Sequence, residues 1–384
     1  MRKICIVVGS RANYSSIKSV MLAVRERKDL QLQLVVTASA LLERYGSPVQ
    51  LMEKDGFTPA ATVHTLIEGE TPLTMAKSTG LGLLEISQVF HGLAPDVVVT
   101  VGDRFETLAT AIASAYMNIP LAHTMGGEVT GTIDESIRHA VTKLAHIHFP
   151  ANDAAAQRII RMGEDPSAVF TVGCPRMDIV SAIAAKHANP EGQEMLALEG
   201  VGGKLDFSKP YLVVMQHPVT TEYERSAEHM RQTLEAIEEL HMPTAFFWPN
   251  ADAGSEDIAR EIRKFRERND DSYIHFYKNL PLESFIPLLL RCACMVGNSS
   301  AGIREGAFLG VPVVNIGTRQ AGRDRGANVI DTDYDRRAIV DAVRKQMAHG
   351  PYQRNAAYGD GKAGKRIADI LATAPLRVQK RLAY

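Results

Sequence analysis

The chain has 384 residues, 45% of them hydrophobic and 23% charged, which is typical of soluble enzymes, and its length favours two domains over one core. Its 43 basic and 44 acidic side chains almost cancel, which argues against a nucleic-acid or membrane partner. The first apolar run, residues 4–8, is shorter than the roughly 7–15 residues of a signal-peptide core, and no apolar stretch approaches the roughly 20 residues that span a bilayer. We therefore expect this run to be a buried strand.

Short apolar runs alternate with longer helical patterns through the first half of the sequence, as in βαβ units that build a parallel sheet. Strands are predicted at residues 3–8, 31–36, 96–101, 120–123, 147–149 and 169–172. Helices are predicted at residues 14–25, 73–93, 105–117 and 135–146.

The alternation weakens near residues 175–210 and then restarts. Further strands are predicted at residues 211–216, 244–248, 273–277, 295–296, 311–316 and 329–331, and a last helix at 363–374. The pattern predicts an α/β fold of two Rossmann-like domains facing a central cleft, with ligands at the carboxyl ends of the strands. The expected domains are residues 1–174 and 175–362, and residues 363–384 are expected to pack back across both.

The chain contains four cysteines, Cys5, Cys174, Cys292 and Cys294. Cys5, Cys292 and Cys294 lie in apolar runs that resemble strands, where free thiols behave as small core residues. The spacing of Cys292 and Cys294 does not fit a zinc knuckle, so no metal site is expected. Unpaired cysteines favour a reducing cytoplasm as the compartment.

A segment of small residues at 297–300 follows a predicted strand and precedes a helical pattern at residues 302–309. The hydroxyls of Ser299 and Ser300 and the backbone N–H groups of a helix start suit a diphosphate, although the same residues could simply cap the helix. Glu305 lies where a carboxylate could accept both hydroxyls of a ribose, or could be a solvent-exposed helix residue.

Other polar residues also follow predicted strands, where their side chains should point into the cleft. In the second half these are His217, Asn250 and Arg319. His217 could donate a hydrogen bond to a phosphate or act as an acid.

In the first half Arg11 follows the first predicted strand, without a dinucleotide fingerprint, and could bind a phosphate or form a salt bridge. Asp103 follows another strand and could lie in the cleft or cap the next helix. Asp134 falls in the first turn of a predicted helix, where a carboxylate could act on a ligand or merely stabilise the helix dipole.

Eight motifs, in order along almost the whole chain, resemble those of the hydrolysing UDP-N-acetylglucosamine 2-epimerases. They are residues 9–12 (GSRA), 102–105 (GDRF), 126–128 (GGE), 131–134 (GTID), 136–140 (SIRHA), 216–221 (QHPVTT), 297–300 (GNSS) and 315–320 (NIGTRQ). The resemblance implies a GT-B-like fold, UDP held mainly by the second domain, and a cytoplasmic homodimer or homotetramer of the kind found in sialic-acid biosynthesis.

The same resemblance implies elimination of UDP from a UDP-linked 2-acetamido sugar, inversion at C2 and addition of water, with no cofactor. It implies that the diphosphate meets Arg11, Ser299 and Ser300, the ribose meets Glu305, and the sugar ring meets Asp103 and Asp134. The residues expected to bind substrate are Arg11, Ser15, Arg104, Asn250, Ser299, Ser300, Glu305 and Arg319. Those expected to be catalytic are Asp103, Glu128, Asp134 and His217.

One position departs from the family pattern. Met125 stands where relatives often have Glu and sometimes His, and its thioether cannot transfer a proton. Glu128 is the nearest substitute. Two other interpretations stay open at this point: a glycosyltransferase with the same fold, and a sugar-nucleotide sensor without turnover.

Overall fold

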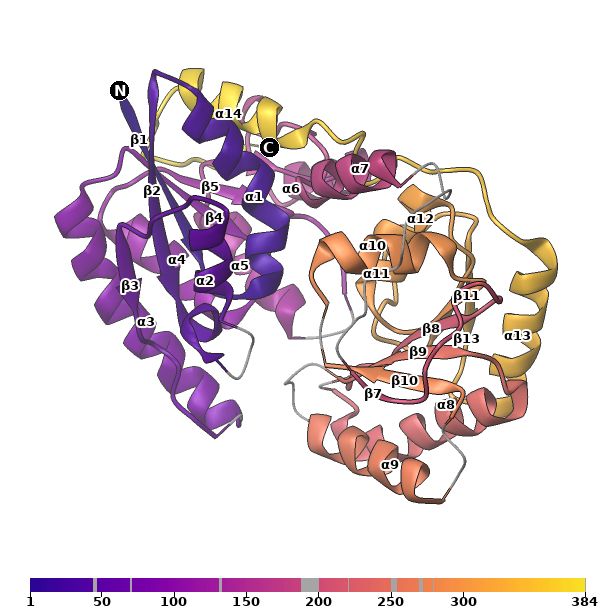
Figure 1. The fold of residues 1–384 in the computed structure, drawn as a ribbon. Coiled ribbons are helices and arrows are strands. Elements are labelled where there is room, and N and C mark those ends of the chain that lie inside the picture. The colour runs from indigo at the N-terminus through magenta and orange to yellow at the C-terminus, as the bar shows by residue number, and fades with distance from the viewer. Residues whose placement is uncertain are drawn as a thin grey trace. The chain divides into compact units, whose positions relative to one another are not determined.

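The computed structural model describes residues 1–43, 47–69, 71–130, 133–187, 200–219, 221–249, 254–268, 272–278 and 280–383. The chain forms two compact units (Figure 1). Unit 1 comprises Met1–Glu128, Asp134–Ile179 and Tyr358–Tyr384, and unit 2 comprises Val129–Ile133 and Val180–Ala357. Unit 1 is therefore built from segments that are far apart in the sequence.

Unit 1 contains a sheet of six parallel strands in the order β3-β2-β1-β4-β5-β6. The strands are β1 (Arg2–Val8), β2 (Leu30–Thr37), β3 (Ala61–Val63), β4 (Val97–Val101), β5 (Leu121–Thr124) and β6 (Ile147–Phe149). The helices that begin in this unit are α1 (Arg11–Glu26), α2 (Pro48–Lys54), α3 (Pro72–Leu93), α4 (Phe105–Tyr116), α5 (Asp134–Leu144), α6 (Asp153–Arg161), α7 (Arg176–Lys186) and α14 (Ala363–Thr373).

The side chains of β1 show why this sheet is buried on both faces. Ile4, Ile6 and Val8 belong to a core that includes α1 and α14 residues, whereas Cys5 and Val7 belong to a second core with α3 and α5 residues. Alternate residues of a strand point to opposite faces, so a continuous apolar run fills both layers. The strand order reverses between β1 and β4, which is where Rossmann-like sheets bind ligands at the carboxyl ends of the strands.

Helix α14 completes unit 1 by packing along α1 (Figure 1). Its first N–H groups, which have no intrahelical partner, are capped by one carboxylate. Asp178 accepts hydrogen bonds from the backbone nitrogens of Ala363 at 2.9 Å and Gly364 at 2.7 Å. The α14 residues Ile367 and Leu371 are fully buried in the core that contains Ile4, Ile6 and Val8.

Unit 2 repeats the topology of unit 1. Its six parallel strands have the order β13-β12-β11-β8-β9-β10, and the short β7 is added antiparallel to β10. The strands are β7 (Val201–Gly202), β8 (Leu212–Met215), β9 (Thr244–Phe247), β10 (Ile274–Tyr277), β11 (Cys294–Gly297), β12 (Val313–Ile316) and β13 (Val329–Thr332). The helices are α8 (Ser226–Leu240), α9 (Ser255–Arg268), α10 (Leu282–Arg291), α11 (Ser300–Ile303), α12 (Glu305–Leu309) and α13 (Arg336–His349).

The order of strands in unit 2 reverses between β8 and β11, as it does between β1 and β4 in unit 1. The prediction of two Rossmann-like domains is therefore confirmed. The change from unit 1 to unit 2 at Ile179 and Val180 lies a few residues beyond the boundary expected at residue 174. No helix in the described part of the chain has the length and apolar character needed to cross a bilayer.

The structure differs from the local predictions in three places. Residues 169–172 form no strand: Val169 makes only an isolated bridge with His148, beside β6. The short strands β3 and β7 were not predicted. The helix expected at 302–309 is divided into α11 and α12 at Arg304, because Gly302 and Gly306 each disfavour a continuous helix by about 1 kcal/mol.

Cys5, Cys292 and Cys294 are buried and form no disulfide, as expected for core thiols, and Cys174 is buried as well. Burial raises the pKa of the Cys5 thiol to about 12 and that of Cys294 to about 12, so neither is a thiolate at neutral pH.

Candidate active site

Asn298 joins the two strands that flank the reversal point of unit 2. Its side-chain oxygen accepts a hydrogen bond from the backbone nitrogen of His217 at 2.8 Å, and its side-chain nitrogen donates to the carbonyl of His217 at 2.8 Å. The preceding residue, Gly297, has a φ of +129°, and a Cβ there would lie 2.1 Å from the Met215 carbonyl. The chain therefore needs glycine to bring these strand ends together.

The backbone carbonyl of Asn298 holds two further side chains. The Arg319 guanidinium donates to it at 3.2 Å, and the Gln320 amide donates at 2.9 Å. This hydrogen bond holds the half-buried guanidinium of Arg319 after β11, close enough to His217 for its charge to help lower the pKa of that imidazole. A guanidinium fixed in this way suits a phosphate group.

His217 is buried and uncharged at neutral pH. Burial, together with the positive charge of Arg319, lowers the pKa of its imidazole to about 3. Because a neutral imidazole carries one N–H, His217 is equipped to donate a hydrogen bond rather than to supply a full positive charge.

Ser299 and Ser300 lie next to Asn298 at the start of α11. The Ser299 hydroxyl accepts a hydrogen bond from the nitrogen of Ala301 at 3.3 Å, which is the capping role foreseen as the alternative interpretation. The Ser300 hydroxyl accepts from the Arg304 guanidinium at 3.1 Å. Both hydroxyl hydrogens can still donate to an anion.

Glu305 begins α12 and is 1% exposed, so its interpretation as a solvent-exposed helix residue was wrong. Asn250 lies outside the described residues. His217, Arg319, Ser299, Ser300 and Glu305 all belong to unit 2.

Arg138 is the central charge of the unit 1 site. Its side chain, on α5, is 1% exposed and forms an ion pair with Asp103, which follows β4. It also donates to the backbone carbonyl of Glu128 at 2.7 Å. Burial lowers the pKa of Arg138, but the charges of Asp103, Glu128 and Asp134 outweigh this and raise it, so the guanidinium is always protonated. Three carboxylates are thus coupled to one buried cation.

His123, on β5, supports the loop that carries Asp103. Its Nε2 lies 2.7 Å from the carbonyl of Gly102, and its Nδ1 lies 3.4 Å from the Thr142 hydroxyl of α5. Burial lowers the pKa of His123 to about 4, so the ring is neutral and Nε2 donates to the carbonyl.

The loop after β5 has a constrained backbone at Met125 and Gly127. Met125 has a φ of +64°, and its half-buried side chain packs against the core that contains Tyr14 and Phe149. Gly127 has a φ of +73°, and a Cβ there would lie 2.2 Å from the carbonyl oxygen of Ala155. These constraints place the buried Glu128 beside Arg138.

The other unit 1 candidates are also at strand ends. Arg11 and Ser15 lie in the first turns of α1, directly after β1, and both are half-buried. Arg104 forms an ion pair with the buried Glu106 at 3.1 Å. Asp134 is the first residue of α5 and is half-buried, one turn before Arg138.

Two residues that organise these sites were given no role from the sequence. The signal for Arg138 was a charged residue on the helix face that also carries the buried Val141 and Thr142. The signal for Asn298 was a polar residue that ends a wholly apolar strand. In the described part of the chain no three His, Cys, Asp or Glu side chains gather in a way that could hold a metal ion.

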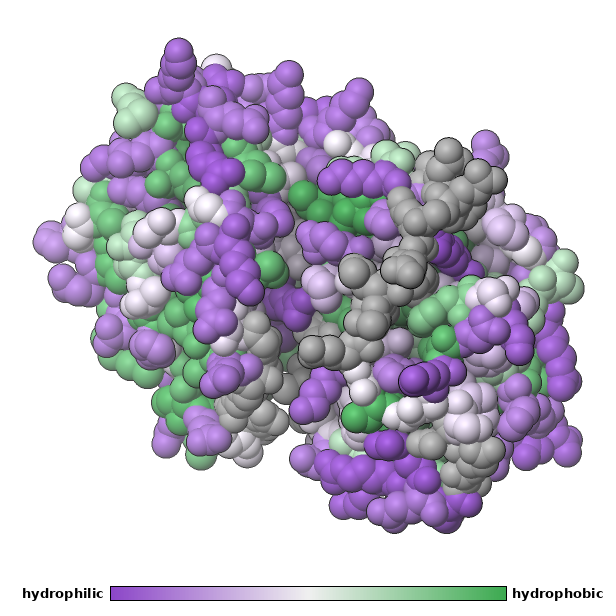
Figure 2. Space-filling model, viewed as in Figure 1, coloured by the Kyte–Doolittle hydropathy of each residue, from purple (hydrophilic) through white to green (hydrophobic). Residues whose placement is uncertain are grey.

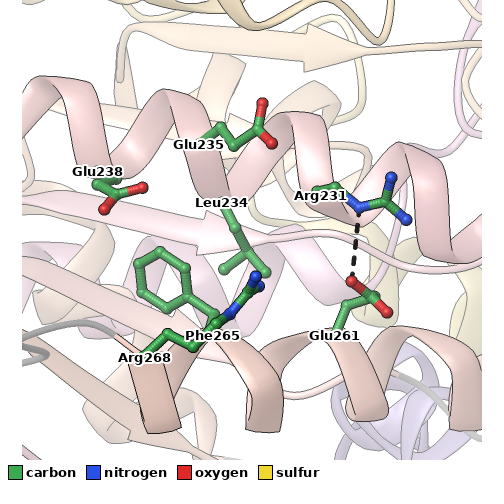
Figure 3. Close-up of a pocket in the computed structure, with 7 residues that line it drawn as sticks. All are labelled: Arg231, Leu234, Glu235, Glu238, Glu261, Phe265 and Arg268. Atoms are coloured by element: carbon green, nitrogen blue, oxygen red, sulfur yellow. Dashed lines mark ion pairs between the residues drawn. The ribbon is translucent and has the colours of Figure 1, made fainter.

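A separate pocket of about 180 Å³ lies between α8 and α9 (Figure 3). It is lined by Arg231, Leu234, Glu235, Glu238, Glu261, Phe265 and Arg268, with an ion pair of 3.6 Å between Arg231 and Glu261. None of the candidate site residues lines it, so it is distinct from the groups described above.

A family model described as UDP-N-acetylglucosamine 2-epimerase matches residues 22–372. The chain belongs to this family. The match covers most of both units, so the family prediction is confirmed, and with it the prediction that the chain is an enzyme.

Relatives of this family align over nearly the full length. The chain is 34% identical to the UDP-N,N'-diacetylbacillosamine 2-epimerase (hydrolyzing) of Legionella pneumophila, over 99% of this chain and 98% of that protein. It is 32% identical to the UDP-N-acetylglucosamine 2-epimerase of Neisseria meningitidis, over 97% and 95% of the two chains.

Solved structures of the family share the fold. The crystal structure of UDP-GlcNAc 2-epimerase from Neisseria meningitidis bound to UDP-GlcNAc matches with a TM-score of 0.78 and 15% identity, over 96% of this chain and 99% of that one. The Methanocaldococcus jannaschii UDP-GlcNAc 2-epimerase in complex with UDP-GlcNAc and UDP matches with a TM-score of 0.76 and 19% identity, over 96% and 99%. The expected fold class is thereby confirmed.

We predict that the free energy of unfolding falls as the pH drops below about 6.5. His217 and His123 have folded-state pKa values of about 3 and about 4, below the unfolded value of 6.5, so the unfolded chain binds more protons in this range. Each histidine should contribute a slope of up to about 1.4 kcal/mol per pH unit. The free energy of unfolding can be measured by urea titration at several pH values between 7 and 4.5. Its decrease per pH unit should be smaller for His123→Gln than for the wild type. Equal slopes for the two proteins would contradict the neutral, buried state of His123.

Proposed function

We propose that this enzyme is a hydrolysing 2-epimerase that converts a UDP-linked 2-acetamido sugar and water into UDP and the free sugar inverted at C2. The observation that carries the proposal is the group of three carboxylates, Asp103, Glu128 and Asp134, coupled to the buried Arg138 in a chain of this family. The names of its relatives support UDP-N-acetylglucosamine and UDP-N,N'-diacetylbacillosamine as the substrates to test first.

The reaction needs proton transfers on two faces of the sugar. A base removes the weakly acidic proton at C2 as the C1–O bond to UDP breaks, which leaves a C1–C2 double bond. An acid then returns a proton to C2 from the opposite face, and the hydroxyl of water forms a bond to C1. Two positioned carboxylates can supply these steps, each worth typically 10²–10⁴-fold in rate.

We assign the two transfers to Asp134 and Glu128. Asp103 is committed to an ion pair with Arg138, which suits it to orient a sugar hydroxyl. Asp134 is half-buried at the start of α5, and Glu128 follows the constrained loop at Met125. Because the Met125 side chain packs on the apolar core, Glu128 is the carboxylate left to act in that loop.

The nucleotide half of the substrate is assigned to unit 2. Departure of UDP increases the negative charge on the diphosphate, and preorganised donors stabilise such charge. Arg319, His217, Ser299 and Ser300 are proposed to supply these donors, and Glu305 to accept the ribose hydroxyls. We propose that Arg11, Ser15, Arg104 and Asn250 complete the binding set.

We predict that a UDP-sugar is converted without an acceptor and without an added metal. In D2O the product should carry one deuterium at C2, because the proton returned there comes from an acid that exchanges with solvent. NMR of the sugar and chromatography of UDP measure both products. EDTA treatment should leave the rate unchanged.

Two results would contradict this assignment. Retention of the substrate hydrogen at C2 rules out elimination and re-addition. A strict need for a sugar acceptor identifies a glycosyltransferase, which would share the nucleotide site but transfer the sugar.

We predict that Arg319→Ala weakens UDP binding about tenfold to 150-fold, because a charge-assisted hydrogen bond contributes about 1.5–3 kcal/mol. Arg337→Ala, at an exposed position of α13, is the matched control and should bind UDP as the wild type does. Calorimetry with UDP measures both affinities. If Arg319→Ala binds UDP as tightly as the wild type does, the proposal that the diphosphate binds at Arg319 is wrong.

We predict that Glu128→Gln lowers kcat by roughly 10²–10⁴ and leaves UDP affinity unchanged, because the amide keeps the shape but cannot transfer a proton. Met125→Glu should have little effect, with Met125→Gln as the control for the cost of a polar group at this half-buried position. Steady-state kinetics distinguish the alternatives. If instead the wild type shows no turnover and Met125→Glu does, the natural chain is a sugar-nucleotide sensor.

We also propose a cytoplasmic homodimer or homotetramer acting in a sialic-acid type of pathway. Figure 2 shows a largely hydrophilic face on which apolar residues are scattered. Some large apolar side chains of α3 and α4 are exposed: Leu73, Leu84 and Tyr116 are 64%, 72% and 86% exposed. Single exposed side chains of this kind are also common on monomers, so the proposal of an oligomer rests on the resemblance of the chain to its family. Light scattering of the purified protein tests the assembly, and cell fractionation tests the location.

A further inference from the structure

Helix α5 positions the charged centre of the unit 1 site. Its first residue is Asp134, and Arg138 follows one turn later with its ion pair to Asp103. The last four carbonyls of any α-helix have no partner within the helix. At the carboxyl end of α5 the nitrogen of Ala145 donates to the carbonyls of Val141 at 2.9 Å and Thr142 at 3.3 Å, and side chains from elsewhere in the chain can add further donors.

Lys380 supplies those donors from a segment more than two hundred residues away. Its ammonium group donates to the carbonyls of Lys143 at 2.7 Å and Thr142 at 3.3 Å, and to that of Ala145. These carbonyls are at or just beyond the end of α5. A positive charge at this end also interacts favourably with the helix dipole.

The same ammonium group is fixed by a buried carboxylate. Glu164, 2% exposed, lies 2.6 Å from Lys380, and it also accepts hydrogen bonds from Lys143 at 2.6 Å and His148 at 3.1 Å. Burial alone would raise the pKa of Glu164, but these three donors outweigh it and lower the pKa to about 2. The carboxylate is therefore charged at neutral pH and holds Lys380 at the helix end.

Backbone contacts on both sides of Lys380 hold the 375–383 segment in place. The Nδ1 atom of His146 accepts from the nitrogen of Leu121 at 3.1 Å, so its Nε2 carries the hydrogen and donates to the carbonyl of Val378 at 2.7 Å. The nitrogen of Ala383 donates to the carbonyl of Gly163 at 3.0 Å. The segment thus lies along the ends of α5 and α6 without forming a helix of its own.

We propose that Lys380 is a positioning residue for the epimerase reaction: it fixes the carboxyl end of α5 and so keeps Arg138 and Asp134, at the other end, in register with Asp103. This inference rests on the proposed function of those residues. Because α5 has only 11 residues, a shift at one end is transmitted to the other. A misplacement of about 1 Å at a reacting centre can cost about 10²-fold in rate.

Lys380→Ala should lower kcat about tenfold or more, while the KM for the UDP-sugar and the affinity for UDP stay within about twofold. The reason is that the main residues proposed to hold the nucleotide are in unit 2, and that Arg11 and Ser15 are on α1 rather than α5. Lys380→Arg, which keeps the charge and the donors, should recover most of the loss. Arg381→Ala is the matched control, because it removes an exposed cation from the adjacent position and should behave as the wild type.

Hydrogen exchange gives a second measurement that does not depend on turnover. In Lys380→Ala the amides of residues 134–145 should exchange faster, while those of α8 and α13 should be unchanged.

If the wild type turns over no UDP-sugar, the proposed function fails and the exchange result alone decides the role of Lys380. Unchanged kcat together with unchanged exchange in α5 would overturn the inference, as would a fall in kcat that Arg381→Ala matches. If Lys380→Ala does not fold, Lys380→Gln, which removes the charge but keeps donors, decides by the same two measurements.

Discussion

The buried guanidinium of Arg138 is the constraint on which the unit 1 site depends. A charge that is almost wholly removed from water is tolerated only when it is paired and hydrogen-bonded. Asp103 supplies the pair and the Glu128 carbonyl supplies a further acceptor, so the loops after β4 and β5 are both tied to α5. Replacing Arg138 by an apolar residue would remove both the ion pair and the hydrogen bond that hold these two loops against α5.

The two units share one topology but place different chemical groups at the same edge of the sheet. In each, polar residues stand at the carboxyl ends of the two strands where the order reverses. Unit 2 joins these ends with the neutral amide of Asn298 and presents donors, which suits an anion. Unit 1 joins its loops through a cation and presents carboxylates, which suits proton transfer. The difference follows from the side chain that links the loops in each unit, which is the amide of Asn298 in unit 2 and the guanidinium of Arg138 in unit 1.

Local patterns predicted most strands because β-branched runs bounded by Gly or Pro are strong signals; residues 147–149 were predicted to the residue. The two-residue β7 could not be predicted, since only its pairing with His275 and Phe276 makes it a strand. Asp103, His217 and Arg319 were identified as candidates because they follow strands. Asn298, Arg138 and Lys380 could not be assigned roles, because their functions lie in contacts with partners distant in sequence.

The discontinuity of unit 1 has a consequence for biosynthesis. All the strands of its sheet precede the long segment of unit 2, Val180–Ala357, but α14 and the 375–383 segment follow it. A ribosome therefore finishes unit 2 while the α1 face of unit 1 still lacks its cover and α5 still lacks Lys380. Until the last residues emerge, the nascent chain exposes the apolar surface that Ile367 and Leu371 later bury, and exposed apolar surface of this kind is what chaperones bind. Unit 1 can therefore be completed only after residues 180–357 have been synthesised, and its completion closes a loop of the chain that contains this whole segment.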